Sequence, residues 1–182
     1  MSTEYDYTLL QSFGKKIFIS KNVEIRRPKL VTIGKNVAID TGFYCTVKAE
    51  IGDYVHIGPY VTIIGGKEGY FKMGHFTTIG AGSRIICVSY EYQGVGLVGP
   101  TIPTQYQDNR ITAKVTIEDF AGIGTNVVVF PGVRLAQGSV VGAGSLVTVS
   151  TEPWTIYVGN PARPIKSRRK DIMIKMAHKL GY

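Results

Sequence analysis

Few side chains in this chain could move a proton, and they are far apart in the sequence. The histidines are His56, His75 and His178, and the carboxylate Glu91 stands between two tyrosines. A histidine or a carboxylate can take a proton from a nucleophile, as group transfer to a hydroxyl or an amine requires. We take His56, His75 and Glu91 as candidate general bases and expect His178 to be solvated. A lone histidine in such a position is more often a surface or subunit-contact residue.

The two cysteines give no sign of thiol or metal chemistry. Cys45 and Cys87 are far apart in the sequence, and two cysteines provide neither a disulfide framework nor the paired spacing of a zinc site. Both stand at or beside apolar positions, where small buried residues are common. We expect a structural role for both and no bound metal.

A repeat of six residues must position the candidate bases. One apolar series recurs at every sixth position, and a second series runs two residues ahead of it. The first series comprises Ile33, Ile39, Cys45, Ile51, Ile57 and Ile63, then Met73, Ile79 and Ile85, and then Ile117, Ile123, Val129, Leu135, Val141 and Val147. This period fits neither an α-helix nor hairpin strands. It fits a parallel β-helix whose flat faces each use six residues.

Three such faces make one coil of about 18 residues, so successive coils stack their apolar residues into one core. The fold class predicted is all-β, a parallel β-helix of about five coils with a long excursion loop and a short C-terminal α-helix. We assign an N-terminal cap to 1–30, the β-helix to 31–152, and an extended segment and helix to 153–182. Apolar spacing predicts that helix at about 167–180, and we expect it to cover the open edge of the last coil.

The repeat is interrupted twice, and both interruptions predict surface loops. A short surplus falls at 65–69, and a long polar, proline-bearing segment occupies 87–113. A loop this long inside a compact domain is often functional. Its tyrosines, Tyr90, Tyr92 and Tyr106, favour an ordered loop that lies against a partner surface.

Composition is that of one soluble domain. Of 182 residues, 44% are hydrophobic, enough for a sizeable core. No run approaches the roughly 20 apolar residues of a membrane span, and the first residues lack the regions of a secretory leader. We therefore expect a cytoplasmic protein.

The net charge is +8, and many of the basic residues lie near the two ends. They could form an ordinary solvated surface, or they could attract a polyanionic small ligand. The basic tail lacks the aromatics that stack bases, so we expect no nucleic acid.

The repeat and two segments of the sequence resemble a known family. The hexads and the segment VGNPARPIK at 158–166 are similar to the left-handed β-helix acyltransferases, the hexapeptide-repeat family that uses acetyl-CoA. The stretch at 58–86, followed by YEYQG, resembles sugar acetyltransferases of surface-polysaccharide (lipopolysaccharide or capsule) biosynthesis. The resemblance implies left-handed coils and a homotrimer with active sites between subunits. It also implies transfer of acetyl from coenzyme A to a sugar amine or hydroxyl, without a metal.

One corner of the predicted helix is a candidate groove for acetyl-CoA. The residues that follow successive second-face positions are Asp40, Gly58, Gly80, Gly124 and Gly142. A glycine column lets a linear ligand such as pantetheine approach the backbone, and Thr125 and Ala143 lie beside it. The resemblance places Arg163 and Lys166 near the phosphates of the nucleotide end. Local steric demands could equally account for the glycines, because the first face carries a partial column at Gly34, Gly52 and Gly74.

The base is the open question. We call the residues of the first apolar series rungs. In members of the family that acylate hydroxyls, a histidine follows the central rung, but the matching positions 88–91 of this chain contain no histidine. His56 and Glu91, with His75 in reserve, therefore remain alternatives. An amine that arrives unprotonated needs little more than a proton acceptor, so the missing histidine favours an amino sugar. The sugar, its nucleotide or lipid carrier, and N- or O-acylation stay open.

Three other functions fit parts of the pattern. A γ-type carbonic anhydrase shares the architecture but needs three zinc-binding histidines, and the repeats hold two. A non-catalytic trimeric scaffold would explain the missing histidine but not the glycine column. The third is acetylation of a xenobiotic such as an antibiotic. Family members with that function follow the family's histidine pattern more closely than this chain does.

Overall fold

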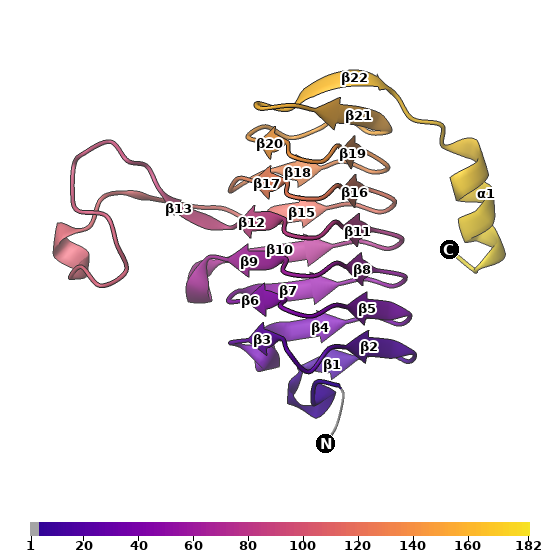
Figure 1. Ribbon diagram of the computed structural model, residues 1–182, viewed down its shortest axis with the longest axis horizontal. Coiled ribbons are helices and arrows are strands. Elements are labelled where there is room, and N and C mark those ends of the chain that lie inside the picture. The colour runs from indigo at the N-terminus through magenta and orange to yellow at the C-terminus, as the bar shows by residue number, and fades with distance from the viewer. Residues whose placement is uncertain (1–3) are drawn as a thin grey trace.

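The chain winds into a solenoid of short strands. The computed structural model describes residues 4–182, and Figure 1 shows the strands stacked in regular layers with α1 alongside them. Three sheets run along the solenoid, with six, eight and six strands. The predicted parallel β-helix is confirmed, as are its excursion loop and its C-terminal α-helix.

Each of six coils contributes one strand to each sheet, and two further strands extend the second sheet. The first sheet comprises β1 (Ser12–Phe13), β4 (Val31–Ile33), β7 (Lys48–Ile51), β10 (Tyr70–Met73), β15 (Val115–Ile117) and β18 (Arg134–Leu135). The second comprises β2 (Ile17–Ile19), β5 (Val37–Ile39), β8 (His56–Ile57), β11 (Thr78–Ile79), β16 (Gly122–Ile123), β19 (Val140–Val141), β21 (Thr155–Val158) and β22 (Arg163–Ser167). The third comprises β3 (Glu24–Ile25), β6 (Tyr44–Cys45), β9 (Thr62–Ile64), β12 (Arg84–Ile86), β17 (Val128–Val129) and β20 (Leu146–Val147).

The interior of the solenoid is the predicted apolar series. Every member from Ile33 to Val147 is buried, with at most 5% of its surface exposed. Members of successive coils pair in register, so that Ile57 lies between Ile39 and Ile79. Burying one branched side chain stabilises the fold by about 1.5–3 kcal/mol. The stacked rungs are therefore the main force that holds one coil on the next.

The segment before Val31 winds as a further coil. Strands β1, β2 and β3 pair in parallel with β4, β5 and β6, which places Ile19 beside Ile39 and Ile25 beside Cys45. The 3-10 helices η1 (Tyr7–Leu9) and η2 (Pro28–Leu30) flank this coil. From Ile25 the next rung lies eight positions on, at Ile33, and this step hides the coil from a strict six-residue pattern.

An aromatic ladder runs along the corner between the first and second sheets. Its members, Tyr54, Phe76, Phe120 and Trp154, all have positive φ, between 52° and 64°. Neighbouring ring centroids lie 4.9, 5.3 and 5.8 Å apart along the ladder. Left-handed backbone is unfavourable for bulky residues, and the stacking of four rings compensates for it in these turns.

The C-terminal helix α1 (Asp171–Lys179) packs beside this ladder and not over the last coil. That expectation was wrong, because β22 pairs antiparallel with β21 and covers the last coil itself. The Arg168 guanidinium donates to the carbonyls of Phe120 and Gly138 at 2.7 and 3.0 Å. At the other end of α1, the Tyr182 hydroxyl donates to Asp53. In the described part of the chain, no helix is long and apolar enough to cross a membrane.

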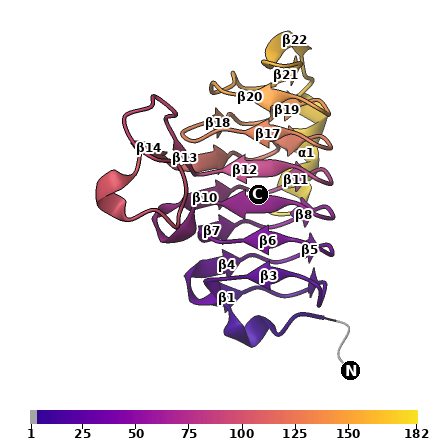
Figure 2. The same ribbon diagram turned by 60° about the vertical axis from the view of Figure 1, so that its left-hand side comes forward.

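The two interruptions of the repeat form the predicted loops. The short one contains η3 (Gly66–Glu68). The long one forms an antiparallel ribbon of β13 (Val88–Tyr90) and β14 (Arg110–Thr112), with η4 (Thr104–Tyr106) near its tip. In Figures 1 and 2 the ribbon projects from the solenoid on the side away from α1. Large apolar side chains of the loop are exposed, with fractions of 69% for Tyr92, 68% for Val95, 59% for Leu97 and 60% for Tyr106.

Candidate functional site

The predicted glycines line one corner, where the second sheet turns into the third. Each glycine amide donates to a rung carbonyl of the following coil: Gly58 to Ile79, Gly80 to Ile123, Gly124 to Val141 and Gly142 to Tyr157, at 2.7 to 2.9 Å. A Cβ on Gly80 would lie 2.5 Å from the Thr125 nitrogen, and one on Gly124 would lie 2.6 Å from the Ala143 nitrogen. Close stacking of coils therefore explains these glycines without any ligand.

The same corner nevertheless offers hydrogen-bond donors to a ligand. Thr125 and Ala143 are exposed, and within residues 4–182 neither backbone amide has a hydrogen-bond partner. Both amides lie over glycines of the preceding coil, where no side chain covers them. A linear ligand with amide carbonyls, such as pantetheine, can accept hydrogen bonds from such donors.

The two predicted phosphate-binding cations lie beyond the last coil, at the end of this corner. Arg163 and Lys166 are exposed residues of β22. Arg163 pairs with Val158, and the Val158 side chain approaches Gly142, the last glycine of the column. Guanidinium and ammonium groups there suit phosphate oxygens.

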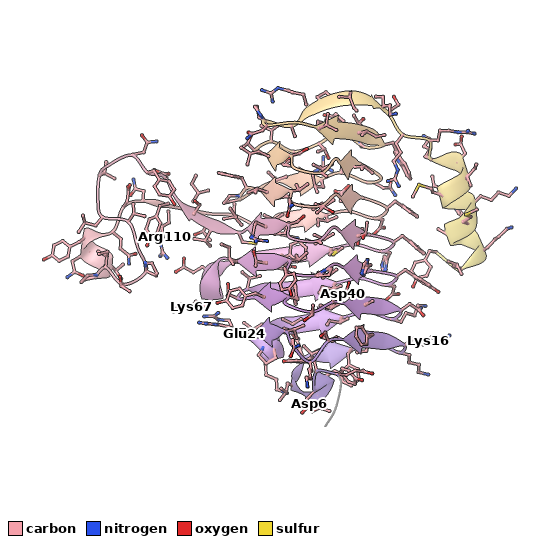
Figure 3. All side chains as sticks on the ribbon, in the orientation of Figure 1. Asp6, Lys16, Glu24, Asp40, Lys67 and Arg110 are labelled. Carbon is pink, nitrogen blue, oxygen red and sulfur yellow. The ribbon has the colours of Figure 1, made fainter. Side chains whose placement is uncertain are left out.

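A histidine–aspartate pair lies at the other end of the column. His56 Nε2 and Asp40 Oδ2 are 2.9 Å apart, with 54% and 32% of the two side chains exposed. Asp40, labelled in Figure 3, occupies the column position below Gly58. A carboxylate accepts hydrogen bonds, so Nε2 carries the imidazole proton and Nδ1 keeps its lone pair. The pair therefore presents an oriented proton acceptor.

The distance between the His56–Asp40 pair and the cations Arg163 and Lys166 suits an extended ligand. From His56 the outward row of the second sheet runs through Thr78, Gly122, Val140 and Ile156 to Lys166. This row spans five strand spacings of about 4.8 Å each, or about 24 Å. That distance is comparable to an extended pantetheine arm with its pyrophosphate.

His75 lies at a different corner, beside the aromatic ladder. Its Nδ1 accepts the Asp53 amide at 2.9 Å, its own amide donates to Asp119 at 2.7 Å, and its ring lies 5.1 Å from Tyr182. The neutral ring then carries its proton on Nε2, and Nδ1 could take a second proton only by giving up the hydrogen bond from the Asp53 amide. This geometry suits a structural role better than that of a base.

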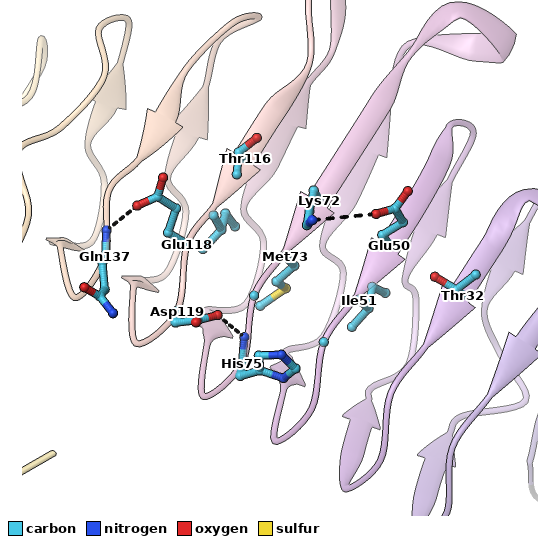
Figure 4. A pocket seen from close by; sticks show the side chains of 13 residues that line it. Thr32, Glu50, Ile51, Lys72, Met73, His75, Thr116, Glu118, Asp119 and Gln137 are labelled. Carbon is cyan, nitrogen blue, oxygen red and sulfur yellow. Dashed lines mark hydrogen bonds and ion pairs between the residues drawn. The ribbon is translucent and has the colours of Figure 1, made fainter. Parts of the chain in front are cut away.

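A groove of about 500 Å³ extends from His75 over the first sheet (Figure 4). Two carboxylates of the groove already accept hydrogen bonds. Glu118 accepts from the Arg134 guanidinium, outside the groove, and from the backbone amide of Gln137, both at 2.9 Å. Glu50 accepts from the Tyr70 hydroxyl at 2.6 Å, which lowers the pKa of Glu50 and raises that of Tyr70 to about 12. The groove offers polar walls but no available base.

Comparison with known proteins places the chain in a family. No family model matches it. A dTDP-4-amino-4,6-dideoxy-D-glucose acyltransferase from Escherichia coli is 32% identical over 168 residues, which cover 90% of this chain and 85% of that protein. The chain belongs to the left-handed β-helix acyltransferases. The resemblance drawn from the hexads and the VGNPARPIK segment is confirmed, and so is the prediction of an acyltransferase.

Solved structures agree along the whole length of this acyltransferase. AntD, an N-acyltransferase from Bacillus cereus, is 35% identical with a TM-score of 0.92, and the match covers 100% of this chain and 98% of that one. AntD has been solved with coenzyme A and dTDP-4-amino-4,6-dideoxyglucose, and with 3-hydroxybutyryl-CoA and dTDP. A probable macrolide acetyltransferase from Lysinibacillus sphaericus is 31% identical over 72% of this chain and 70% of that protein.

Within one subunit the acyltransferase brings some predicted site residues together and keeps others apart. Gly124, Thr125, Gly142 and Ala143 gather at one corner, and Arg163 lies at its end. Glu91, at the end of β13, is exposed, and its amide donates to the Asn109 carbonyl at 2.9 Å. Figure 2 shows β13, which ends directly before Glu91, leading out of the solenoid. The role of Glu91 as a base stays a prediction.

Sequence reasoning named His56 as a candidate base but did not connect it with Asp40. A signal was present, because the stacking of coils places His56 beside Ala38, and Asp40 follows two positions later on the same side of the chain. A carboxylate there is within reach of the imidazole. Spacing alone does not show that the two side chains turn toward each other, which the structure does.

The cysteines lie in the core, as expected. Cys45 and Cys87 have 1% and 0% of their surface exposed. Burial raises the pKa of the Cys45 thiol to about 11 and that of Cys87 to about 12, so both stay protonated near neutral pH and are poor nucleophiles. Within residues 4–182, no group of three or more histidine, cysteine, aspartate or glutamate side chains is arranged to hold a metal ion.

Proposed function

We propose that this acyltransferase moves an acetyl group from acetyl-CoA to the amine of a nucleotide-linked amino sugar. The observation that supports this most is the match to AntD along the whole chain, because AntD has been solved with coenzyme A and dTDP-4-amino-4,6-dideoxyglucose. The Escherichia coli relative is named for the same sugar nucleotide. An N-linked product also agrees with the absence of histidine at positions 88–91.

In this proposal the glycine corner holds the donor. The pantetheine arm lies along the corner and accepts hydrogen bonds from the amides of Thr125 and Ala143, beside Gly124 and Gly142. Arg163 and Lys166 contact the phosphates at the nucleotide end, where their charges are exposed and screened by salt. The thioester then reaches the level of His56, about five strand spacings away.

The reaction is acyl transfer through a tetrahedral intermediate. The sugar amine attacks the thioester carbonyl, a C–N bond forms, and the C–S bond breaks to release coenzyme A. His56 Nδ1 takes the proton that the attacking nitrogen loses, and this proton then goes to the departing thiolate. Asp40 holds the other ring nitrogen at 2.9 Å and stabilises the imidazolium that forms in between.

An acyl-transfer assay tests the proposed function directly. With acetyl-CoA and dTDP-4-amino-4,6-dideoxyglucose, we expect stoichiometric release of free thiol and a product heavier by one acetyl group. The matched acceptor dTDP-6-deoxyglucose, which differs only in carrying a hydroxyl in place of the amine, should release little thiol. Transfer to dTDP-6-deoxyglucose but not to the amino sugar would contradict N-acylation, and transfer to neither would contradict a dTDP-linked 4-amino sugar as the acceptor.

We also propose a homotrimer whose subunits share each active site. The support is the excursion loop, whose apolar side chains Tyr92, Val95 and Tyr106 are 60% to 69% exposed in the single subunit. Sedimentation at micromolar concentration should give a particle near three times the 19.9 kDa of the chain. A monomer that still binds acetyl-CoA would contradict shared sites.

The proposed substrates suggest where the reaction belongs. Nucleotide-linked sugars and acetyl-CoA are both cytoplasmic metabolites, and acylated amino sugars are building blocks of surface polysaccharides. We therefore place the enzyme in the cytoplasm and in O-antigen, lipopolysaccharide or capsule biosynthesis. Extraction of the cell surface polysaccharide from a deletion strain should show the corresponding sugar without its acetyl group.

A further inference from the structure

A second groove, of about 660 Å³, lies on the outer face of the second sheet, beside His56. Its walls include Lys16 and Asn36 from the turns that enter the sheet, the aromatic side chains Phe18 and Tyr54, and the small residue Ala38. We call it the aromatic groove. It belongs to the N-terminal half of the solenoid, whereas the candidate coenzyme A corner extends from His56 toward the C-terminal end.

The order of side chains along this groove is set by strand register. Phe18 lies beside Ala38, and Ala38 lies beside His56. Phe18 and His56 are therefore two strand spacings apart, or about 10 Å. The alanine between them carries a single methyl group, so it leaves the space between the two rings open.

Three side chains of the groove are available to a ligand. Phe18 is 42% exposed although it is aromatic. Lys16 is exposed, and none of the ion pairs formed by residues 4–182 involves it. The side-chain amide of Asn36 likewise has no hydrogen-bond partner in the described chain. Figure 3 shows Lys16 projecting from the turn before β2.

These groups match the chemistry of a nucleoside diphosphate. An aromatic face stacks on a base, an amide can donate to and accept from base edges, and a lysine ammonium binds phosphate oxygens. If the acyl donor reaches His56 along the glycine corner, the acceptor must reach it from another side. From His56 the aromatic groove extends two strands toward the N-terminus, to Phe18, and one strand toward the C-terminus, to Thr78, so most of it lies on the side of His56 away from Arg163 and Lys166.

We propose that the aromatic groove binds the nucleotide half of the acceptor, with its base on Phe18, its diphosphate near Lys16 and the sugar amine at His56. This inference rests on the proposed function, and it adds the acceptor site. Neither the donor corner nor the histidine–aspartate pair depends on it.

Calorimetry with two probes, dTDP and thymidine, tests the groove. Phe18→Ala should weaken the binding of both probes about tenfold, because it removes the stacking surface. Lys16→Gln should weaken dTDP several-fold and leave thymidine unchanged, because thymidine carries no phosphate. Phe13→Ala and Lys15→Gln are matched controls, since Phe13 is 45% exposed on the first sheet and Lys15 neighbours Lys16 outside the groove. Both should bind dTDP as the wild type does.

The outcomes separate this inference from the proposed function. If the wild type acylates the amino sugar but Phe18→Ala leaves both dTDP binding and the KM for the sugar nucleotide unchanged, the groove assignment is wrong and the function stands. If Phe18→Ala weakens acetyl-CoA binding equally, the effect is on folding or assembly, and the assignment is again wrong. If the wild type transfers no acyl group, the proposed function itself fails.

Discussion

Gly80→Ala is expected to destabilise the solenoid by about 3 kcal/mol. An added Cβ would lie 2.5 Å from the Gly124 carbonyl carbon and 2.5 Å from the Thr125 nitrogen. Both atoms belong to the backbone of the next coil, so neither can rotate away as a side chain would. Urea unfolding followed by circular dichroism measures the change, at one fixed protein concentration so that the proposed trimer contributes equally to every variant.

Gly122→Ala is the matched control. Gly122 belongs to the same coil as Gly124, but its added Cβ would meet only side-chain atoms, Thr78 Cγ2 at 3.6 Å and Val140 Cγ2 at 3.8 Å. These are ordinary contacts, so the free energy of unfolding should stay within about 0.5 kcal/mol of the wild type. Equal stability of Gly80→Ala and Gly122→Ala would show that the coils do not stack as closely as the structure has them.

The glycines illustrate what sequence spacing can and cannot predict. Their period placed Gly80, Gly124 and Gly142 at one corner, and the structure agrees. The spacing could not distinguish a groove for a ligand from close stacking of the coils, because both require a residue without a side chain at these positions. Distances to the following coil show that steric need alone is sufficient, and the unpaired amides of Thr125 and Ala143 are what point to a ligand.

The core was predictable because burial repeats with the coil, whereas the aromatic ladder was missed. Tyr54, Phe76, Phe120 and Trp154 each stand three residues before a buried second-sheet residue, so the signal was in the sequence. The left-handed turn at that position usually favours glycine or asparagine. Bulky residues at that position indicate a compensating contact. In this structure the rings stack on one another and α1 packs against them, so α1 lies beside the coils.

The base could not be fixed from the sequence, because the sequence does not show the direction of side chains. His56 and Asp40 are 16 positions apart, and only the structure shows their side chains to meet at 2.9 Å. Spacing placed His56 one residue before Ile57 and His75 two residues after Met73, but it could not show that the Asp53 amide occupies the Nδ1 of His75. Glu91 follows β13 at the root of the excursion loop, and its contacts in the proposed trimer would not be visible in a pattern within one chain.

His56→Gln is expected to lower kcat for acyl transfer by about 10²–10⁴-fold, the usual contribution of a positioned general base. Acetyl-CoA affinity should change little, because the donor contacts proposed for Thr125, Ala143 and Arg163 do not involve the imidazole. Glutamine keeps the approximate size and polarity of the side chain but cannot take the proton. Thiol release measures kcat, and calorimetry measures the affinity for acetyl-CoA.

Four further variants decide whether the pair or another group is the base. Asp40→Asn should also lower kcat, but less than His56→Gln, because it disturbs the orientation of the ring and leaves the acceptor nitrogen in place. His178→Gln, in an exposed residue of α1, should have no effect. A loss of activity confined to Glu91→Gln would assign the base to the loop, and one confined to His75→Gln would assign it to the opposite corner. If no variant lowers the rate more than about tenfold, far less than a positioned base supplies, the amine arrives already deprotonated and the site only orients it.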